Sequence, residues 1–198
     1  MFQTLLIGSS NRDKAVELAS LLAGLPWQVV SLADHPPVPE PEENGATFAE
    51  NAVLKARYYC DAFKVAAVAD DSGLVVDKLG GAPGVFSARY AGPACTYADN
   101  NRKLLQELAD TPWHERTARF VCCAAFVTSS GETHTELGMV EGHIAAVAEG
   151  GNGFGYDPLF VPLGFDQTFG QMAPARKHEL SHRGQAFRKL RAYLETQV

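Results

Sequence analysis

The feature that most constrains this chain is the stretch from Val65 to Asp77, in which two adjacent aspartates follow an apolar run. A short Val- and Ala-rich segment ends in Asp70 and Asp71, a Ser-Gly pair follows, and a second apolar segment comes after it. Apolar runs of this length predict buried strands, and Asp, Ser and Gly between them predict a turn. Because ligands of α/β sheets usually lie at strand ends, we expect both carboxylates at such an end.

Two neighbouring carboxylates repel each other, so both stay ionised only if a cation or hydrogen-bond donors neutralise them. Hard oxygen ligands of this kind suit Mg²⁺, which keeps several waters and shares its other positions with substrate phosphates. The alternative is an ordinary solvated turn, since Asp and Ser are common turn residues. The rest of the chain has to decide between the two interpretations.

Composition restricts the classes of function. The chain has 198 residues, is 46% hydrophobic and 20% charged, and carries a net charge of −6. This predicts one globular domain over residues 1–198 and argues against general affinity for nucleic acid or anionic membranes. No segment approaches the roughly 20 apolar residues of a membrane span, and the start lacks signal-peptide features. The four cysteines have no Cys-x-x-Cys spacing, which argues against zinc and disulfides. We therefore expect a cytoplasmic protein with no nucleic-acid or membrane partner.

The N-terminal segment predicts a place for phosphates. A strand over Thr4–Gly8 runs into the polar turn from Ser9 to Lys14, and an amphipathic helix follows. A helix N-terminus presents free N–H groups and a positive dipole end to an anion. Ser9 and Asn11 add hydrogen-bonding groups and Lys14 adds a charge, although the glycines of a Walker P-loop are absent. An ordinary helix cap followed by a surface lysine is the alternative.

A loop rich in proline and acidic residues, Asp34–Gly45, precedes the next helix. It is either a solvated loop or a source of metal ligands, with Glu43 well placed beside an Asn-Gly pair. Thr47 and Glu50 form a capping-box pattern, so a helix is expected to about Phe63. On that helix Lys55 lies one turn after Asn51, on the same face.

The second half of the chain continues the alternation of helices and strands. Further elements are predicted at Val29–Leu32 (strand), about Ala98–Leu108 (helix capped by Thr96), Ala118–Thr128 (central strand), Thr133–Val147 (strand), Leu159–Val161 (short strand) and Ser181–Glu195 (capped helix).

Two further segments predict ligand contacts. Glu149–Pro158 places four glycines around Phe154 and Tyr156, which lets the backbone approach a flat ligand on which a ring stacks. A flexible linker is the less suitable interpretation, because linkers rarely carry aromatic residues. Lys177, His182 and Arg183 gather near the start of the last helix, where an anion or a base carbonyl can bind.

These segments together resemble a known family. The matching motifs are Ser9-x-Asn11-x-x-Lys14, Glu43 before Phe48-x-Glu50-Asn51-Ala52-x-x-Lys55-Ala56, Asp70-Asp71-Ser72-Gly73-Leu74, Gly80-Gly81-Ala82-Pro83-Gly84, Ser87-Ala88-Arg89-Tyr90, Phe154-Gly155-Tyr156-Asp157-Pro158 and Ser181-His182-Arg183-Gly184. In this order the chain resembles the Ham1-like inosine/xanthosine triphosphate pyrophosphatases, over nearly its whole length.

The resemblance implies roles for individual residues. Asp71 would be the proton acceptor and a Mg²⁺ ligand, with Glu43 or Glu42 as the other acidic ligand. A nucleoside triphosphate would be the substrate, and the protein would be a homodimer. The residues implied in substrate binding are Ser9, Ser10, Asn11, Arg12, Asp13, Lys14, Lys55, Asp70 and Ser72 for the triphosphate, Phe154, Gly155, Tyr156 and Asp157 for base and sugar, and Lys177, His182 and Arg183 for the purine.

We therefore expect an α/β fold with a long mixed sheet flanked by helices, in two lobes with a nucleotide-binding cleft between them. The expected reaction is Mg²⁺-dependent hydrolysis of ITP, dITP or XTP to the monophosphate and pyrophosphate. Two alternatives stay open: a phosphatase with Asp71 as covalent nucleophile, and a nucleotide sensor without turnover.

Overall fold

The computed structural model describes residues 3–197, apart from the side chain of Asp13. The strands in this part of the chain are β1 (Gln3–Ile7), β2 (Trp27–Ser31), β3 (Ala66–Val76), β4 (Thr117–Val127), β5 (Thr133–Ile144) and β6 (Phe160–Pro162). Its α-helices are α1 (Arg12–Leu21), α2 (Phe48–Phe63), α3 (Tyr97–Glu107), α4 (Pro174–Leu180) and α5 (His182–Glu195).

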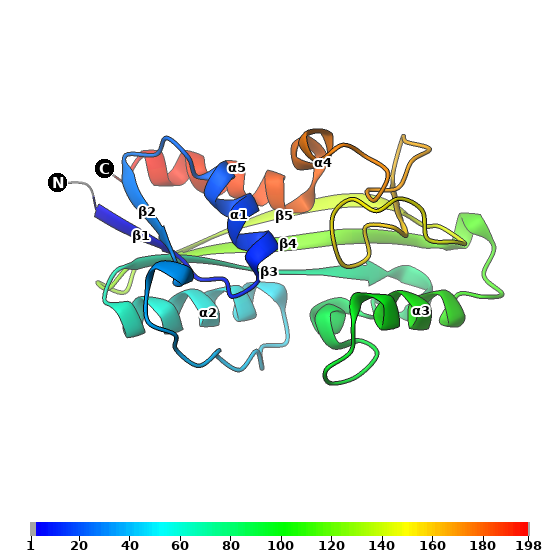
Figure 1. Cartoon of the computed structure of the whole chain (residues 1–198), viewed down its shortest axis with the longest axis horizontal. Helices are drawn as coiled ribbons and strands as arrows, with labels where there is room; N and C mark the ends of the chain where they lie inside the picture. The colour runs from blue at the N-terminus through cyan, green and yellow to red at the C-terminus, as the bar shows by residue number, and fades with distance from the viewer. Residues whose placement is uncertain (1–2, 198) are drawn as a thin grey trace. The chain divides into compact units, whose positions relative to one another are not determined.

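The described strands form one six-stranded sheet in the order β2-β1-β3-β4-β5-β6 (Figure 1). The pairings of β1 with β2 and with β3 are parallel, and that of β5 with β6 is antiparallel. The sheet is thus mixed and flanked by helices, which confirms the predicted α/β fold. Among the described residues, no helix has the length and apolarity that crossing a membrane requires.

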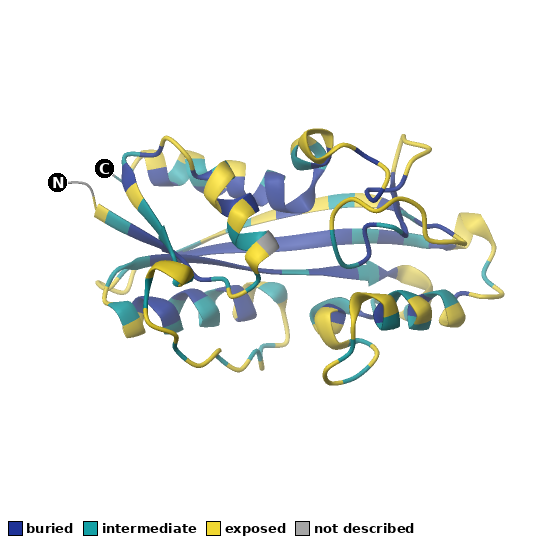
Figure 2. Ribbon diagram, viewed as in Figure 1, coloured by how far each residue is buried: buried dark blue, intermediate teal, exposed yellow. Residues whose placement is uncertain are grey.

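The described chain divides into two units, residues 3–71, 122–138 and 183–197 in the first and 72–121 and 139–182 in the second. In the first unit, alternate residues of the strands face opposite sides of the sheet. Leu5, Val68 and Phe126 pack with α1 and α5, whereas Leu6 and Ala67 pack with α2. Figure 2 shows β3 and β4 as mostly buried.

The second unit has a core of its own. Leu104 of α3 packs with Leu74 at the end of β3, with Phe120 of β4 and with Phe160 and Phe169 from the C-terminal part of the unit. The predicted single domain over residues 1–198 and the cleft between two lobes stay predictions.

Most predicted elements are present with shifted ends. The capping boxes at Thr47 and Thr96 are confirmed, because each threonine side chain accepts a hydrogen bond from the third helical residue. The prediction of a turn at Asp70–Gly73 was wrong, since β3 runs through it without interruption. Side-chain partners for both carboxylates let them stay buried within the sheet. The short helix α4 was not predicted, although Pro174 at its first turn is a typical start signal.

Candidate active site

Asp71 is a buried carboxylate of β3, held by α2. Its Oδ2 accepts a hydrogen bond from Asn51 Nδ2 at 3.1 Å, and its Oδ1 lies 3.4 Å from Lys55 Nζ. The same Lys55 ammonium donates to Glu43 Oε1 at 2.8 Å, and the side-chain Oδ1 of Asn51 accepts a hydrogen bond from the Gly45 amide at 2.8 Å. One helical face thereby brings the acidic loop and the strand carboxylate together.

The surroundings of Asp71 and Lys55 raise the pKa values of both side chains. Burial raises the pKa of the Asp71 carboxyl above its usual value, and the charge of Glu43 adds to this, while Lys55 and Asn51 oppose it. Burial works to lower the pKa of the Lys55 ammonium, but the carboxylates of Asp71, Asp70 and Glu43 outweigh it and the pKa is raised. A carboxylate with a raised pKa next to a charged lysine is a candidate general base.

Asp70 has a different set of partners. Its Oδ2 lies 3.6 Å from Lys14 Nζ and accepts a hydrogen bond from Arg183 Nε at 3.3 Å. Arg183 Nη1 donates to Glu17 Oε2 at 2.8 Å. Burial alone would lower the pKa of this guanidinium, but Asp70 and Glu17 raise it. Asp70 therefore belongs to a buried ion-pair cluster formed with α1 and α5.

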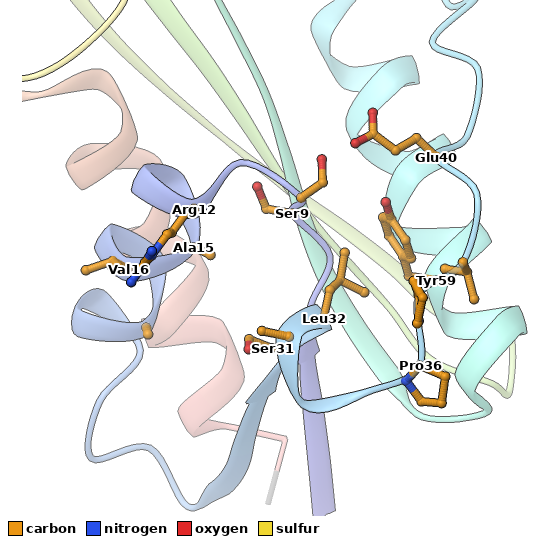
Figure 3. A pocket seen from close by; sticks show the side chains of 14 residues that line it. Ser9, Arg12, Ala15, Val16, Ser31, Leu32, Pro36, Glu40 and Tyr59 are labelled. Atoms are coloured by element: carbon orange, nitrogen blue, oxygen red, sulfur yellow. The ribbon is translucent and has the colours of Figure 1, made fainter.

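The predicted phosphate-binding turn begins after Gly8. Asn11 is the N-cap of α1, and its side chain accepts the Lys14 amide at 3.1 Å. Ser9 and Ser10, together with Arg12, line a pocket of about 690 Å³ whose other side is formed by residues 31–33 and 36–38, Glu40 and Tyr59 (Figure 3). We call this the α1 pocket. The side chain of Asp13, also predicted to bind phosphate, lies outside the described part.

The glycine-rich segment of the second unit forms a compact aromatic site. Asp157 Oδ2 accepts the Phe154 amide at 2.7 Å and Lys177 Nζ at 2.6 Å, and that ammonium lies 5.0 Å from the centre of the Phe154 ring. Gly153 has a φ of 75°, and a Cβ there would lie 2.0 Å from Asp157 Oδ2, so only glycine fits. This arrangement gives Phe154 a fixed orientation beside a cation.

The other predicted residues of this unit have mainly structural contacts. The Tyr156 hydroxyl donates to the Ser87 carbonyl oxygen at 2.9 Å, and burial raises its pKa. The His182 ring is buried and stacks on Phe120 with centroids 4.7 Å apart. Ser72 follows Asp71 in the chain and is partly exposed.

The structure thus brings together three groups of predicted residues: Glu43, Lys55 and Asp71; Lys14, Asp70 and Arg183; and Phe154, Asp157 and Lys177. Glu43 approaches Lys55, whereas Glu42 is exposed. Sequence reasoning missed two residues. Glu17 binds Arg183, and the side-chain amide of Asn101 donates to the Gly155 carbonyl oxygen at 3.0 Å. No local pattern indicates either, because each partner is distant in the sequence.

Comparisons with known proteins show the family of the chain. A protein-family model described as "Ham1 family" matches residues 5–193 of the chain. The chain belongs to the Ham1 family. It is 47% identical to the "dITP/XTP pyrophosphatase" of Exiguobacterium sibiricum over 97% of both chains, and 47% identical to that of Listeria monocytogenes over 94% of this chain and 92% of the relative. The solved HAM1 protein of Coxiella burnetii covers 100% of both chains with a TM-score of 0.90 and 38% identity.

Another solved relative, a "Nucleoside-triphosphatase / dITP/XTP pyrophosphatase" from Mycobacterium abscessus, is 44% identical with a TM-score of 0.78 over 96% of this chain and 98% of its own. The Ham1 family was the family predicted from the motifs, and this prediction is confirmed.

The residues near Lys55 fit the ligand set of Mg²⁺. The carboxylate oxygens of Glu43 and Asp71 both lie next to the same cation, the Lys55 ammonium. Over the described residues no three His, Cys, Asp or Glu side chains gather as a metal site. One or two carboxylates are what Mg²⁺ uses when waters and substrate phosphates fill its other positions.

Proposed function

We propose that this Ham1-family protein hydrolyses deaminated purine nucleoside triphosphates, ITP, dITP and XTP, to the monophosphate and pyrophosphate with Mg²⁺. The observation that carries the proposal is the buried Asp71 carboxylate, held by Asn51 and Lys55 with Glu43 beside the same ammonium. The names of the curated relatives, which are dITP/XTP pyrophosphatases, support the choice of substrate.

In the proposed mechanism Asp71 orients the attacking water and takes its proton. A base of raised pKa held in a fixed orientation suits this role, because general base catalysis depends on position first and pKa second. Lys55 and Lys14 offset the negative charge that develops on the phosphates, and the N-terminus of α1 presents its free N–H groups to them. Glu43 and Asp71 would hold Mg²⁺, which when bound would offset further phosphate charge.

For the base, the proposal keeps the predicted contacts of the second unit. The Phe154 ring offers a stacking surface, and Lys177 offers a donor that is already oriented by Asp157. Hypoxanthine and xanthine carry a 6-oxo acceptor where adenine carries an amino donor. Lys and Arg side chains only donate, so they pair with the oxo group and leave adenine unpaired.

The first experiment identifies the products formed from ITP and Mg²⁺. Pyrophosphate with IMP supports the proposal, orthophosphate supports a phosphatase with Asp71 as nucleophile, and binding without turnover supports a sensor. Omission of Mg²⁺, with a chelator present, should abolish turnover; undiminished activity would refute the metal requirement.

The second experiment compares kcat/KM for ITP, GTP and ATP. Each unpaired buried donor costs about 1–3 kcal/mol, so two donors give about 30-fold to above 10³-fold preference for ITP over ATP. The same ratio is then measured for Lys177→Met, His182→Ala and Arg183→Ala. A variant that keeps the full preference excludes its residue as a base reader.

The proposed homodimer and cytoplasmic location are tested separately. Light scattering during size-exclusion chromatography should give twice the 21.3 kDa chain mass. A monomer at micromolar concentration would refute the dimer, and fractionation of the producing cells tests the location.

A further inference from the structure

One face of α2 carries three residues that each contact the proposed site. Asn51, Lys55 and Tyr59 are spaced four residues apart, so they lie on successive turns of the same face. The first two contact Asp71, as described above. Tyr59 lies one turn further along and contacts Gly8, the residue that joins β1 to the phosphate-binding turn.

The contact between Tyr59 and Gly8 is unusually close. A Cβ placed on Gly8 would lie 2.6 Å from Tyr59 Cδ2 and 3.3 Å from both Cγ and Cε2. Side chains essentially never approach to 2.6 Å, so the ring occupies the space of a side chain at position 8. Gly8 is not among the described glycines with positive φ. Its lack of a side chain therefore serves the contact with the ring rather than a backbone conformation.

Gly8 is also the point where the turn leaves the sheet. Its amide donates to the Val68 carbonyl oxygen at 2.7 Å, a hydrogen bond that belongs to the parallel pairing of Ile7 of β1 with Val68 of β3. Val68 lies two residues before Asp70, and Ser9 follows Gly8 directly. A ring packed on Gly8 consequently restrains both the end of the strand and the start of the phosphate-binding turn.

The ring rather than the hydroxyl makes this contact. Tyr59 is 3% exposed and belongs to the apolar core between α2 and the sheet. Its hydroxyl has no hydrogen-bond partner among the described residues, and Figure 3 shows the side chain along the wall of the α1 pocket together with Ser9.

We infer that Tyr59 is a positioning residue for triphosphate binding: its ring, packed on Gly8, holds the Ser9–Lys14 turn in the conformation that binds phosphate. The inference rests on the proposed function. It assigns to Tyr59 an indirect role, through Gly8, and not a contact with the substrate.

The test compares four variants with the wild type. Tyr59→Ala removes the ring, Tyr59→Phe keeps it, Gly8→Ala inserts a methyl group where the ring lies, and the double variant Gly8→Ala/Tyr59→Ala gives that methyl group room. The quantities measured are KM and kcat for ITP, from pyrophosphate release well below the melting temperature of each variant. Cys60→Ala, in the same buried core, is the matched control.

We expect Tyr59→Ala and Gly8→Ala to lower kcat/KM by roughly 10²-fold, mainly through KM, because small displacements of binding groups have effects of this size. Tyr59→Phe should stay within about twofold of wild type, as expected for a role that needs only the ring. Gly8→Ala should cost clearly less in the Tyr59→Ala background than alone. Cys60→Ala should lower the melting temperature without changing KM.

Two results would overturn the inference. If Tyr59→Ala and Gly8→Ala lower the melting temperature but leave KM unchanged, Tyr59 is only a core residue. If Tyr59→Phe is as impaired as Tyr59→Ala, the hydroxyl and not the ring is what matters.

A readout without substrate separates this inference from the proposed function. Hydrogen exchange of the Gly8 amide, followed by NMR, should be at least about tenfold faster in Tyr59→Ala and unchanged in Tyr59→Phe. Normal exchange in Tyr59→Ala would refute the positioning even if ITP is hydrolysed. Accelerated exchange with no ITP hydrolysis by the wild type would refute the function and leave the positioning of the turn established.

Discussion

Replacing Arg183 by Met tests whether its buried ion pairs stabilise the first unit. The guanidinium is 2% exposed and binds Glu17 at 2.8 Å and Asp70 at 3.3 Å, and both carboxylates are buried as well. Met fills a similar volume, so the main change is the loss of a cation between two buried anions. Removing one partner of a buried ion pair costs about 3–5 kcal/mol. For a chain of this size that corresponds to a fall in melting temperature of about 6–20 °C.

The assay is thermal unfolding at pH 7, followed by circular dichroism. The matched control is Arg176→Met, which breaks an exposed ion pair with Glu179 at 2.8 Å on α4 and should shift the melting temperature by about 2 °C or less. Arg183→Lys keeps the charge but cannot span both carboxylates as the guanidinium does, so it should lie between Met and wild type. If Arg183→Met melts within 2 °C of wild type, the ion pairs contribute no net stability and this reasoning is wrong.

Three further predictions concern turnover, substrate binding and the reactivity of the thiols. Asp71→Asn should keep the fold but lose about 10²–10⁴-fold in kcat, because an amide cannot accept the proton; normal turnover with a normal melting curve would exclude Asp71 from the mechanism. Lys14→Ala and Lys55→Ala should raise KM for ITP, and unchanged KM and kcat in both would place the phosphates elsewhere. Burial raises the pKa of the Cys123 thiol to about 11, so at pH 8 it stays protonated and unreactive. Of the four thiols, only the partly exposed Cys95 should react quickly with iodoacetamide in the native protein, and labelling of several would contradict the burial.

Element types could be predicted because local signals agree with the tertiary structure. The capping box at Thr47 and the apolar run of β4 each appear in a few neighbouring residues. The turn expected at Asp70–Gly73 failed because turn propensity is a local property. Partners from other segments, Asn51 and Arg183 among them, stabilise these carboxylates inside a strand.

The members of the candidate site could be predicted from motifs, but their partners could not. The acidic loop, Lys55 and Asp71 each stand out by residue type and spacing. The ion pair of Glu17 with Arg183 joins positions 166 apart in the sequence, and Glu17 looks like any polar residue of an amphipathic helix. The contact of Gly8 with Tyr59 is similar, since a glycine beside a polar turn suggests backbone freedom rather than space for a ring.

The mutual repulsion of the two adjacent carboxylates is reduced because they face opposite sides of the sheet. Successive residues of a strand alternate in direction, so Asp70 faces α1 and α5 while Asp71 faces α2. Asp70 finds Lys14 and Arg183, and Asp71 finds Lys55 and the Asn51 amide. A single shared cation is therefore not needed to keep both ionised. The cations around Asp70 join β3 to α1 and α5. Asp71 has a raised pKa and is therefore the carboxylate suited to accept a proton.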